Sequence, residues 1–146
     1  MHLTSFRRAA AALLTGALVI VNVPLPAAAA DPVPWTGTVT LRAERAEVDV
    51  HDPVAVLTAS ISPALDHRFL PLSVGIYDNF GTLLASCNTG SRDCSALEAR
   101  KFIDTNSTQT FTAHAAQDLP VNRPPSSARA TSNTVSTTNT GWSGTE

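Results

Sequence analysis

The chain has 146 residues, with 10 basic and 12 acidic side chains and a formal net charge of −2. That length suits one domain of ordinary size with a single hydrophobic core. The slightly acidic balance leaves no basic stripe to neutralise phosphates, so we expect no nucleic-acid partner and no binding to anionic membrane surfaces.

The first 30 residues have the pattern of an export signal. Arg7 and Arg8 precede an almost unbroken apolar run over residues 9–23, and alanines at 28–30 supply a small-residue cleavage site. We predict that residues 1–30 are removed and that the mature protein is secreted, free of the membrane and monomeric. The alternative is an uncleaved anchor, but polar and proline residues interrupt the run before the roughly 20 apolar residues of a spanning helix are reached.

Past residue 31, short segments of alternating apolar and polar residues predict strands, separated by Pro, Gly, Asn and Asp. The first segments are residues 38–43, 46–50 and 54–62. The most regular one is residues 70–78, whose apolar face is predicted to hold Leu70, Leu72, Val74 and Ile76. Turn residues at 78–81 then predict a hairpin, with residues 82–87 as the returning strand.

The second half of the chain predicts further strands at residues 94–99 and 108–115. Residues 117–127 contain three prolines, which remove ladder donors, so this stretch is predicted to be a long connection. Residues 130–138 alternate weakly, with Val135 as their only large apolar residue. Residues 139–146 are predicted to be a disordered tail.

About seven short strands at intervals near ten residues predict an all-β fold, a two-sheet antiparallel sandwich over residues 31–138. The succession of segments resembles bacterial immunoglobulin-like and fibronectin-III-like domains, which recur in secreted actinobacterial proteins; its parts are residues 53–63, 72–78, 81–87, 110–113 and 130–135. The resemblance implies an adhesive, spacing or accessory module and supplies no catalytic residue. The resemblance does not extend to antibody-type domains. Those domains carry a tryptophan on a central strand, whereas Trp35 precedes the first predicted strand.

Cys87 and Cys94 enclose a polar, turn-rich stretch at residues 88–93. In an oxidising compartment we predict a structural disulfide between them, across a local hairpin. Because the cysteines are only seven positions apart, we do not expect this bond to join the two sheets, as the bridge of an antibody domain does. The C-x6-C spacing fits neither a redox motif nor a zinc framework, which leaves free thiols and a metal or redox site as disfavoured alternatives.

A binding surface for sugars would need exposed aromatic rings, and the mature chain has few. Tyr77 lies opposite Ile76 on its strand and Phe80 lies at the tip of the following turn. We therefore name Tyr77 and Phe80 as the candidate binding surface. The sequence favours a competing interpretation, in which Tyr77 belongs to a second core face and only Phe80 is exposed.

Several titratable residues are of the types that bind metals or take part in catalysis. The cluster of Glu44, Glu47, Asp49, His51 and Asp52 has no fixed ligand spacing and is interpreted as a solvated strand edge, with a cation site as the alternative. His67 and His114 are interpreted as ordinary surface residues. The Gly-Trp-Ser-Gly stretch at residues 141–144 lacks the G-x-S-x-G spacing of a nucleophile elbow. We therefore predict no catalytic residue, no metal and no cofactor.

The sequence predicts a secreted, non-catalytic β-sandwich module with a binding, adhesive or structural use at the cell exterior, toward an unidentified extracellular or cell-surface partner. One alternative is a small inhibitor or effector that presents the bridged loop at residues 88–93. A small secreted hydrolase is the less favoured alternative.

Overall fold

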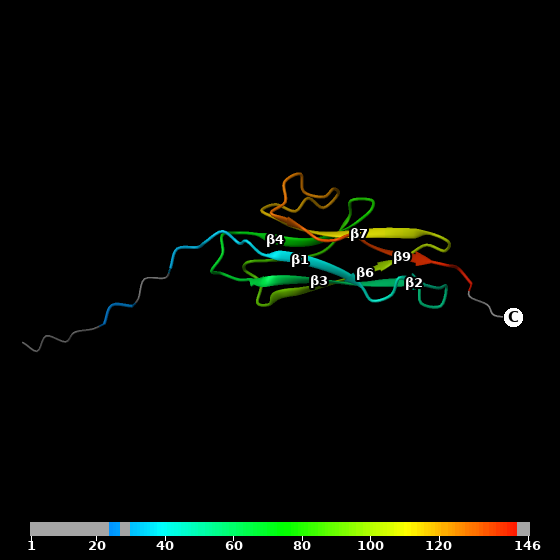
Figure 1. Cartoon of the computed structure of the whole chain (residues 1–146), viewed down its shortest axis with the longest axis horizontal. Coiled ribbons are helices and arrows are strands. Elements are labelled where there is room, and N and C mark those ends of the chain that lie inside the picture. The colour runs from blue at the N-terminus through cyan, green and yellow to red at the C-terminus, as the bar shows by residue number, and fades with distance from the viewer. Residues whose placement is uncertain (1–23, 27–29, 143–146) are drawn as a thin grey trace, which may run out of the picture.

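The structure is a computed structural model that describes residues 24–26 and 30–142. Within these ranges the chain forms nine strands and no helix, and the strands make two sheets packed face to face (Figure 1). The predicted all-β sandwich is therefore confirmed. Most of the predicted export signal, and residues 143–146 of the predicted tail, lie outside the described ranges. In those ranges no helix is long and apolar enough to cross a membrane.

One sheet has three antiparallel strands in the order β1-β3-β6; they are β1 (Thr38–Ala43), β3 (Val54–Leu65) and β6 (Cys94–Phe102). The predicted alternation in β3 is present: Leu57, Ala59 and Ile61 are buried against the other sheet. Both β3 and β6 run further than the sequence predicted, by three residues each. Their long pairing gives the sandwich its longest ladder.

The second sheet has the order β2-β9-β7-β4-β5, with β8 paired to β7 off this path. Its strands are β2 (Glu47–Val48), β4 (Ser73–Asp78), β5 (Leu83–Asn88), β7 (Thr108–Ala116), β8 (Ala130–Thr131) and β9 (Val135–Asn139). The predicted β4–β5 hairpin is confirmed, whereas β2 runs parallel to β9. Neighbours that are far apart in the chain, such as β4 and β7, give the crossed connections of an immunoglobulin-like sandwich.

The core lies between the two sheets. The segment before β1 supplies its tryptophan, the only buried one among the described residues. Trp35 is 3% exposed, and its Nε1 donates a hydrogen bond to the carbonyl oxygen of Pro63 at 2.8 Å. A Cβ atom at Gly37 would lie 2.2 Å from the Trp35 ring. Glycine at that position therefore lets the chain pass over the ring as it enters β1.

Several element boundaries differ from the predictions for physical reasons. β4 begins at Ser73 rather than at Leu70, because Pro71 has no N–H to give to a ladder, and Leu70 is 43% exposed instead of facing the core. The predicted strand over residues 130–138 is broken at Asn133. The side-chain amide of Asn133 accepts from the backbone N–H of Leu41 and donates to its carbonyl oxygen, at 3.0 and 2.8 Å, which closes the edge of β1.

The last strand, β9, is polar and nevertheless ends within the range predicted as a tail, at Asn139. The Asn139 side chain is buried, and its Nδ2 donates to the carbonyl oxygen of Ile103 at 2.9 Å. Thr137 is also buried, with its hydroxyl donating to the carbonyl oxygen of Arg45 at 3.1 Å. Buried hydrogen bonds thus hold β9 in the core, although the strand has few of the large apolar side chains that a core strand usually carries.

Cys87 and Cys94 form the predicted disulfide, with their Cα atoms 5.8 Å apart. The expected local hairpin is wrong, however, because Cys87 lies in β5 and Cys94 in β6, which belong to different sheets. The chain crosses from one sheet to the other within residues 89–93. The bond therefore joins the two sheets along one side of the sandwich.

A second link between the sheets lies further along the same side. Nζ of Lys101, in β6, is 3.0 Å from Oδ2 of Asp78, at the end of β4. The Asp78 side chain is completely buried, and its Oδ1 accepts hydrogen bonds from the N–H groups of Phe80 and Thr82. One carboxylate thus holds the β4–β5 turn and joins the sheets.

Candidate functional site

The most unusual segment is the connection between β7 and β8, residues 117–129. It lies over the outer face of the second sheet, where it forms the orange loop above β4 and β7 in Figure 1. Connections longer than about 12 residues without secondary structure are uncommon in compact domains, and when they are ordered they are usually functional. The sequence predicted a connection here but no fixed conformation and no site.

Three hydrogen bonds hold this loop to the sheet. The hydroxyl of Tyr77 donates to the carbonyl oxygen of Pro120 at 2.7 Å, and the N–H of Leu83 donates to that of Val121 at 3.1 Å. At the end of the loop, the N–H of Arg129 donates to the carbonyl oxygen of Ala115 at 2.7 Å. The loop is therefore anchored at both ends and along one side.

Leu119 packs beneath the loop, in the space above Gly75. A Cβ atom at Gly75 would lie 2.9 Å from Cδ1 of Leu119 and 2.6 Å from Cδ1 of Leu83. Gly75 thus leaves room for a small apolar cluster on the outer face of the sheet. Leu83 reaches this face, rather than the core, because the β4–β5 register shifts between Ile76 and Tyr77.

The predicted pairing of Tyr77 and Phe80 on one exposed surface is wrong. Tyr77 does point to the face opposite Ile76, but residues 117–129 cover it, so that its side chain is fully buried. Burial raises the pKa of the Tyr77 hydroxyl, which serves as a hydrogen-bond anchor for the loop. Phe80 alone is exposed, at 71%.

His114 lies beside Tyr77 and is also more enclosed than an ordinary surface histidine. Its ring makes an edge-on contact with the Tyr77 ring, with 5.7 Å between centroids. Its two nitrogens lie within hydrogen-bonding distance of the hydroxyls of Thr112 and Thr131, at 3.0 and 3.1 Å. Burial lowers the pKa of His114, so the neutral ring is favoured in this position.

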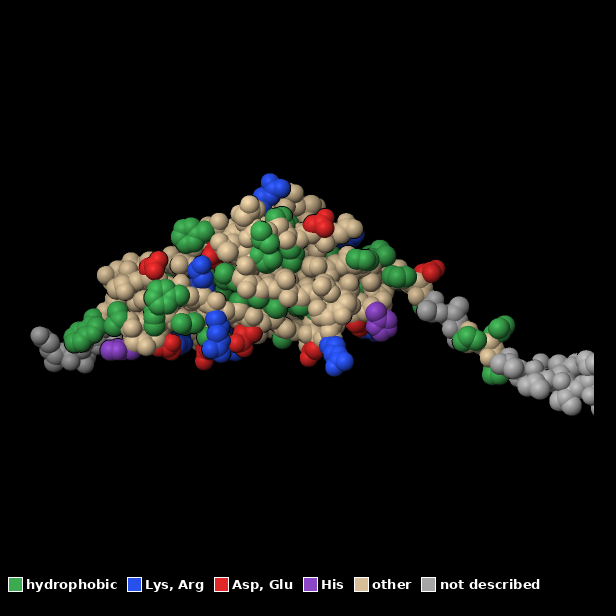
Figure 2. Space-filling view, turned by 180° about the vertical axis from the view of Figure 1, so that it is seen from behind, with side chains coloured by type: hydrophobic (Ala, Val, Ile, Leu, Met, Phe, Trp, Pro, Cys, Tyr) green, Lys and Arg blue, Asp and Glu red, His purple; other side chains and the backbone are tan. Residues whose placement is uncertain are grey.

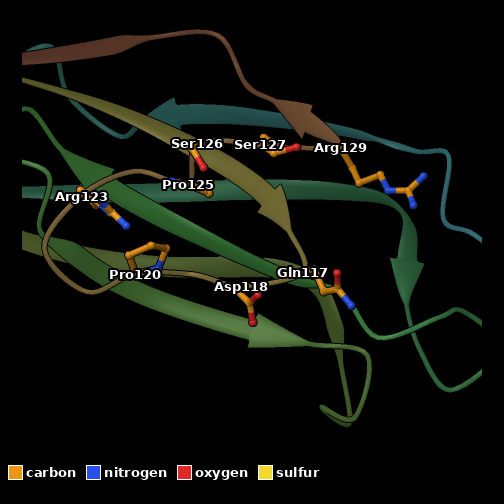
Figure 3. A pocket seen from close by; sticks show the side chains of 9 residues that line it. Gln117, Asp118, Pro120, Arg123, Pro125, Ser126, Ser127 and Arg129 are labelled. Atoms are coloured by element: carbon orange, nitrogen blue, oxygen red, sulfur yellow. The ribbon is translucent and has the colours of Figure 1, made fainter.

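The loop surrounds a hollow of about 450 Å³. Figure 3 shows Arg123 and Arg129 at opposite ends of this hollow, with Asp118, Pro120 and Ser126 between them. A smaller hollow of about 160 Å³ shares Gln117 and Arg129 with it and continues along apolar walls formed by Pro34, Leu70 and Pro71. We call the two hollows together the loop groove; it is elongated, with a polar end and an apolar end.

The charges in the loop groove are not neutralised by neighbours. Among the residues that the structure describes, neither Arg123 nor Arg129 forms an ion pair. Three other arginines of the described residues form ion pairs, Arg45, Arg68 and Arg100, with Asp52, Asp66 and Glu98, whereas Arg42 and Arg92 form none. Among the described residues that line the groove, two guanidinium groups and one carboxylate, that of Asp118, give a net positive charge.

The loop groove lies where immunoglobulin-like folds commonly carry binding loops. Its walls come from the β3–β4 connection (residues 66–72), from the β7–β8 connection (residues 117–129) and from the segment before β1. In immunoglobulin variable domains the corresponding two connections contribute to the antigen-binding end. This correspondence is an analogy of fold, and it assigns no ligand.

The acidic cluster named from the sequence forms a turn. One oxygen of Asp49 accepts hydrogen bonds from the N–H groups of His51 and Asp52, at 2.8 and 3.1 Å, which hold the pKa of Asp49 below its ordinary value. Asp52 pairs with Arg45. Within residues 24–26 and 30–142, no group of three or more His, Cys, Asp or Glu side chains is arranged to hold a metal ion.

The bridged segment at residues 88–93 is a tight polar turn. Oδ1 of Asn88 accepts a hydrogen bond from the N–H of Gly90 at 2.8 Å, and Ser91 bonds to the Asn88 backbone through both its N–H and its hydroxyl oxygen. His67 and residues 141–142 come from other segments, and neither lines the loop groove. Residues 143 and 144 of the Gly-Trp-Ser-Gly stretch lie outside the described residues.

Sequence reasoning missed Arg123 and Arg129 because neither belongs to a motif. The available signal was indirect: three prolines in a connection too long for a simple turn.

No protein-family model matches this chain, and no curated protein matches it. The solved structures with a similar shape include two of one domain. One is the crystal structure of the CARDB domain of the PF1109 protein from Pyrococcus furiosus, in complex with di-metal ions; it is 14% identical, covers 76% of this chain and 97% of its own, and has a TM-score of 0.48. The other is a solution NMR structure of the same domain, with 15% identity, coverage of 75% and 97%, and a TM-score of 0.46.

Proposed function

We propose that this protein is an exported, non-catalytic binding module, of the immunoglobulin-like kind used by secreted bacterial proteins, and that it takes a carboxylate-bearing ligand in the loop groove. The observation that carries the proposal is a long loop fixed to the sheet by hydrogen bonds, with two unpaired guanidinium groups at the ends of an open hollow. A loop that only connected β7 to β8 would need neither the anchors nor the hollow.

The chemistry of the groove favours an elongated anionic ligand with an apolar part. Arginine binds carboxylates through two parallel hydrogen bonds, and such charge-assisted bonds are stronger than neutral ones. Figure 3 shows Arg123 and Arg129 at opposite ends of the hollow, an arrangement that suits an elongated ligand with a carboxylate toward each of them. The walls at Pro34, Leu70 and Pro71 would contact apolar groups next to Arg129. Ser126 and Ser127 line the hollow, but no histidine among the described lining residues could act as the base that activates a serine, which favours binding over nucleophilic catalysis.

Calorimetric titration with a hexaglutamate peptide, compared with hexaglutamine, tests the proposal. We expect hexaglutamate to bind and hexaglutamine not to bind. Arg129→Gln should weaken binding about tenfold, the loss expected for one charge-assisted hydrogen-bonded contact. Asp118→Asn should strengthen binding, because among the described residues Asp118 supplies the only carboxylate that lines the hollow.

Arg100→Gln is the matched control, since Arg100 is an exposed arginine of the other sheet and is paired with Glu98. It should bind hexaglutamate as the wild type does. Equal heats for the two peptides, or equal losses for Arg129→Gln and Arg100→Gln, would contradict binding in the loop groove.

The mass of the protein recovered from the culture medium tests export. We expect residues 31–146, lighter by two hydrogens than the fully reduced chain because of the disulfide. A protein that stays with the cells and keeps its N-terminus would instead be a membrane-tethered domain, and secretion would have to be abandoned.

A further inference from the structure

Two of the most exposed large apolar side chains in the described part of the chain belong to segments that meet beside the loop groove. Phe80, in the β4–β5 turn, and Val121, in the β7–β8 connection, are each 71% exposed. The N–H of Leu83 donates to the carbonyl oxygen of Val121 at 3.1 Å, which ties the strand that leaves the turn to the loop. Single exposed apolar residues are common, but large ones from two segments that meet on one surface mark an interaction site.

The β4–β5 turn packs directly against the backbone of the loop. A Cβ atom at Gly81 would lie 3.0 Å from the carbonyl oxygen of Asn122 and 3.1 Å from Cα of Arg123. Figure 1 shows the green turn beside the orange loop, and Figure 2 shows apolar side chains and a basic side chain together at the top of the molecule, where this loop lies. Phe80 directly precedes Gly81, so it lies beside the Arg123 end of the loop groove.

Hydrogen bonds within the turn fix the backbone that carries Phe80. Oδ1 of Asp78 accepts from the N–H groups of Phe80 and Thr82, at 3.0 and 2.9 Å, and the carbonyl oxygen of Asp78 accepts from the N–H of Gly81 at 3.0 Å. A surface on a fixed turn loses little conformational entropy when a ligand binds. The exposed ring of Phe80 is therefore preorganised for contact.

The charge beside these apolar side chains is basic and unpaired. Among the residues that the structure describes, Arg123 forms no ion pair, and it follows Val121 by two positions in the loop. The other end of the groove repeats the combination, because Arg129 shares a hollow with Leu70, which is 43% exposed. The groove thus has an arginine with an apolar neighbour at each end. We call Phe80 and Val121 the apolar rim.

We propose that the ligand of the loop groove is an extended peptide in which acidic residues are flanked by a large apolar residue. The apolar side chain packs on the apolar rim, and a neighbouring carboxylate binds Arg123. This inference rests on the proposed function and names the class of its ligand. An aromatic side chain on Phe80 adds apolar burial and ring contact to the charge-assisted hydrogen bonds of the guanidinium group. An acidic polysaccharide supplies carboxylates but no large apolar side chain, so it would leave the rim exposed.

Calorimetric titration of the mature protein with two peptides of equal length and charge tests the inference. Hexaglutamate with an alanine at each end measures the contribution of the carboxylates. Hexaglutamate with a tryptophan at each end adds the apolar contact, and it presents a tryptophan to the apolar rim in either direction of binding. We expect the tryptophan-flanked peptide to bind about tenfold more tightly than the alanine-flanked one.

Substitution of the apolar rim should remove this preference. In the variant Phe80→Ser/Val121→Ser the ratio of the two affinities should fall from about tenfold to less than about twofold. Phe102→Ser is the control, because Phe102 is also an exposed phenylalanine, at 59%, but belongs to β6 in the other sheet. It should keep the tenfold ratio. Each substitution replaces an exposed side chain, and urea unfolding of both variants checks that they fold as the wild type does.

The outcomes distinguish this inference from the proposed function. If the alanine-flanked peptide does not bind, the proposed function fails and the inference fails with it. If both peptides bind equally well, the groove takes an acidic ligand without the apolar rim, and the inference alone is overturned. Polygalacturonate, an acidic polysaccharide, would also overturn it by binding more tightly than the tryptophan-flanked peptide.

Discussion

Replacing Lys101 by methionine is expected to lower the free energy of unfolding by about 3 kcal/mol, because it leaves a completely buried carboxylate without its cation. Lys101 is the only lysine of the chain, and its Nζ lies 3.0 Å from Oδ2 of Asp78. The estimate is at the low end for a buried pair because the Lys101 side chain keeps 29% exposure. Urea unfolding of the purified mature protein measures the loss.

The double variant Lys101→Met/Asp78→Asn separates a lost ion pair from a lost turn. An asparagine at position 78 can still accept hydrogen bonds from the N–H groups of Phe80 and Thr82, whose distances to Oδ1 are 3.0 and 2.9 Å. We therefore expect the double variant to recover at least half of the stability lost in the single one. A double variant as unstable as Lys101→Met would mean that the buried charge is not the cause.

The pairing of Asp78 with Lys101 also makes the free energy of unfolding depend on pH. Burial alone would raise the pKa of Asp78, but the N–H of Thr82, the Lys101 ammonium and the N–H of Phe80 together hold that pKa below its ordinary value. A carboxyl whose pKa is lowered in the folded state contributes stability that is complete above its unfolded pKa of about 3.9 and is lost as the pH falls through the folded value. Asp78→Asn should therefore flatten the loss of stability below about pH 4.

Removing the disulfide is the second change with a large expected effect. Cys87→Ala/Cys94→Ala should lower the free energy of unfolding by about 2.5 kcal/mol, the chain-entropy value for a closed loop of about eight residues. Because the bond joins β5 of one sheet to β6 of the other, the loss should be accompanied by faster hydrogen exchange in both strands.

Reduction with dithiothreitol supplies the control for the disulfide. It should destabilise the wild type by a similar amount and leave the double alanine variant unchanged. If the double variant unfolds at the same urea concentration as the oxidised wild type, the bridge does not stabilise the sandwich.

The sequence predicted most of the strands, because apolar and polar residues alternate regularly at the sandwich core. Leu57, Ala59 and Ile61 in β3 are an example, as is the β4–β5 hairpin around Gly81, whose φ of 81° suits glycine. The weakest strand, β9, was harder because its buried positions are Thr137 and Asn139. Their place in the core depends on hydrogen bonds to Arg45 and Ile103, which no local pattern reveals.

The features that could not be predicted from the sequence depend on contacts between residues far apart in the chain. The faces of Tyr77 and Ile76 were assigned correctly, but whether the second face is open depends on residues 117–129, some 40 positions away. Whether Cys87 and Cys94 lie in one sheet or in two depends on where the chain crosses between the sheets. A separation of seven positions is enough for that crossing. The loop groove likewise forms only where residues 117–129 meet the segment before β1 and the β3–β4 connection.

Amide chemical-shift mapping of the labelled mature protein, titrated with hexaglutamate, decides whether the loop groove is the binding site. We predict that the shifts concentrate in residues 117–129, with smaller shifts at Trp35 and at residues 70–72, and that Arg129→Gln removes most of them. Shifts that concentrate on the β1-β3-β6 sheet, or a spectrum that hexaglutamate leaves unchanged, would contradict this site and the proposed function with it.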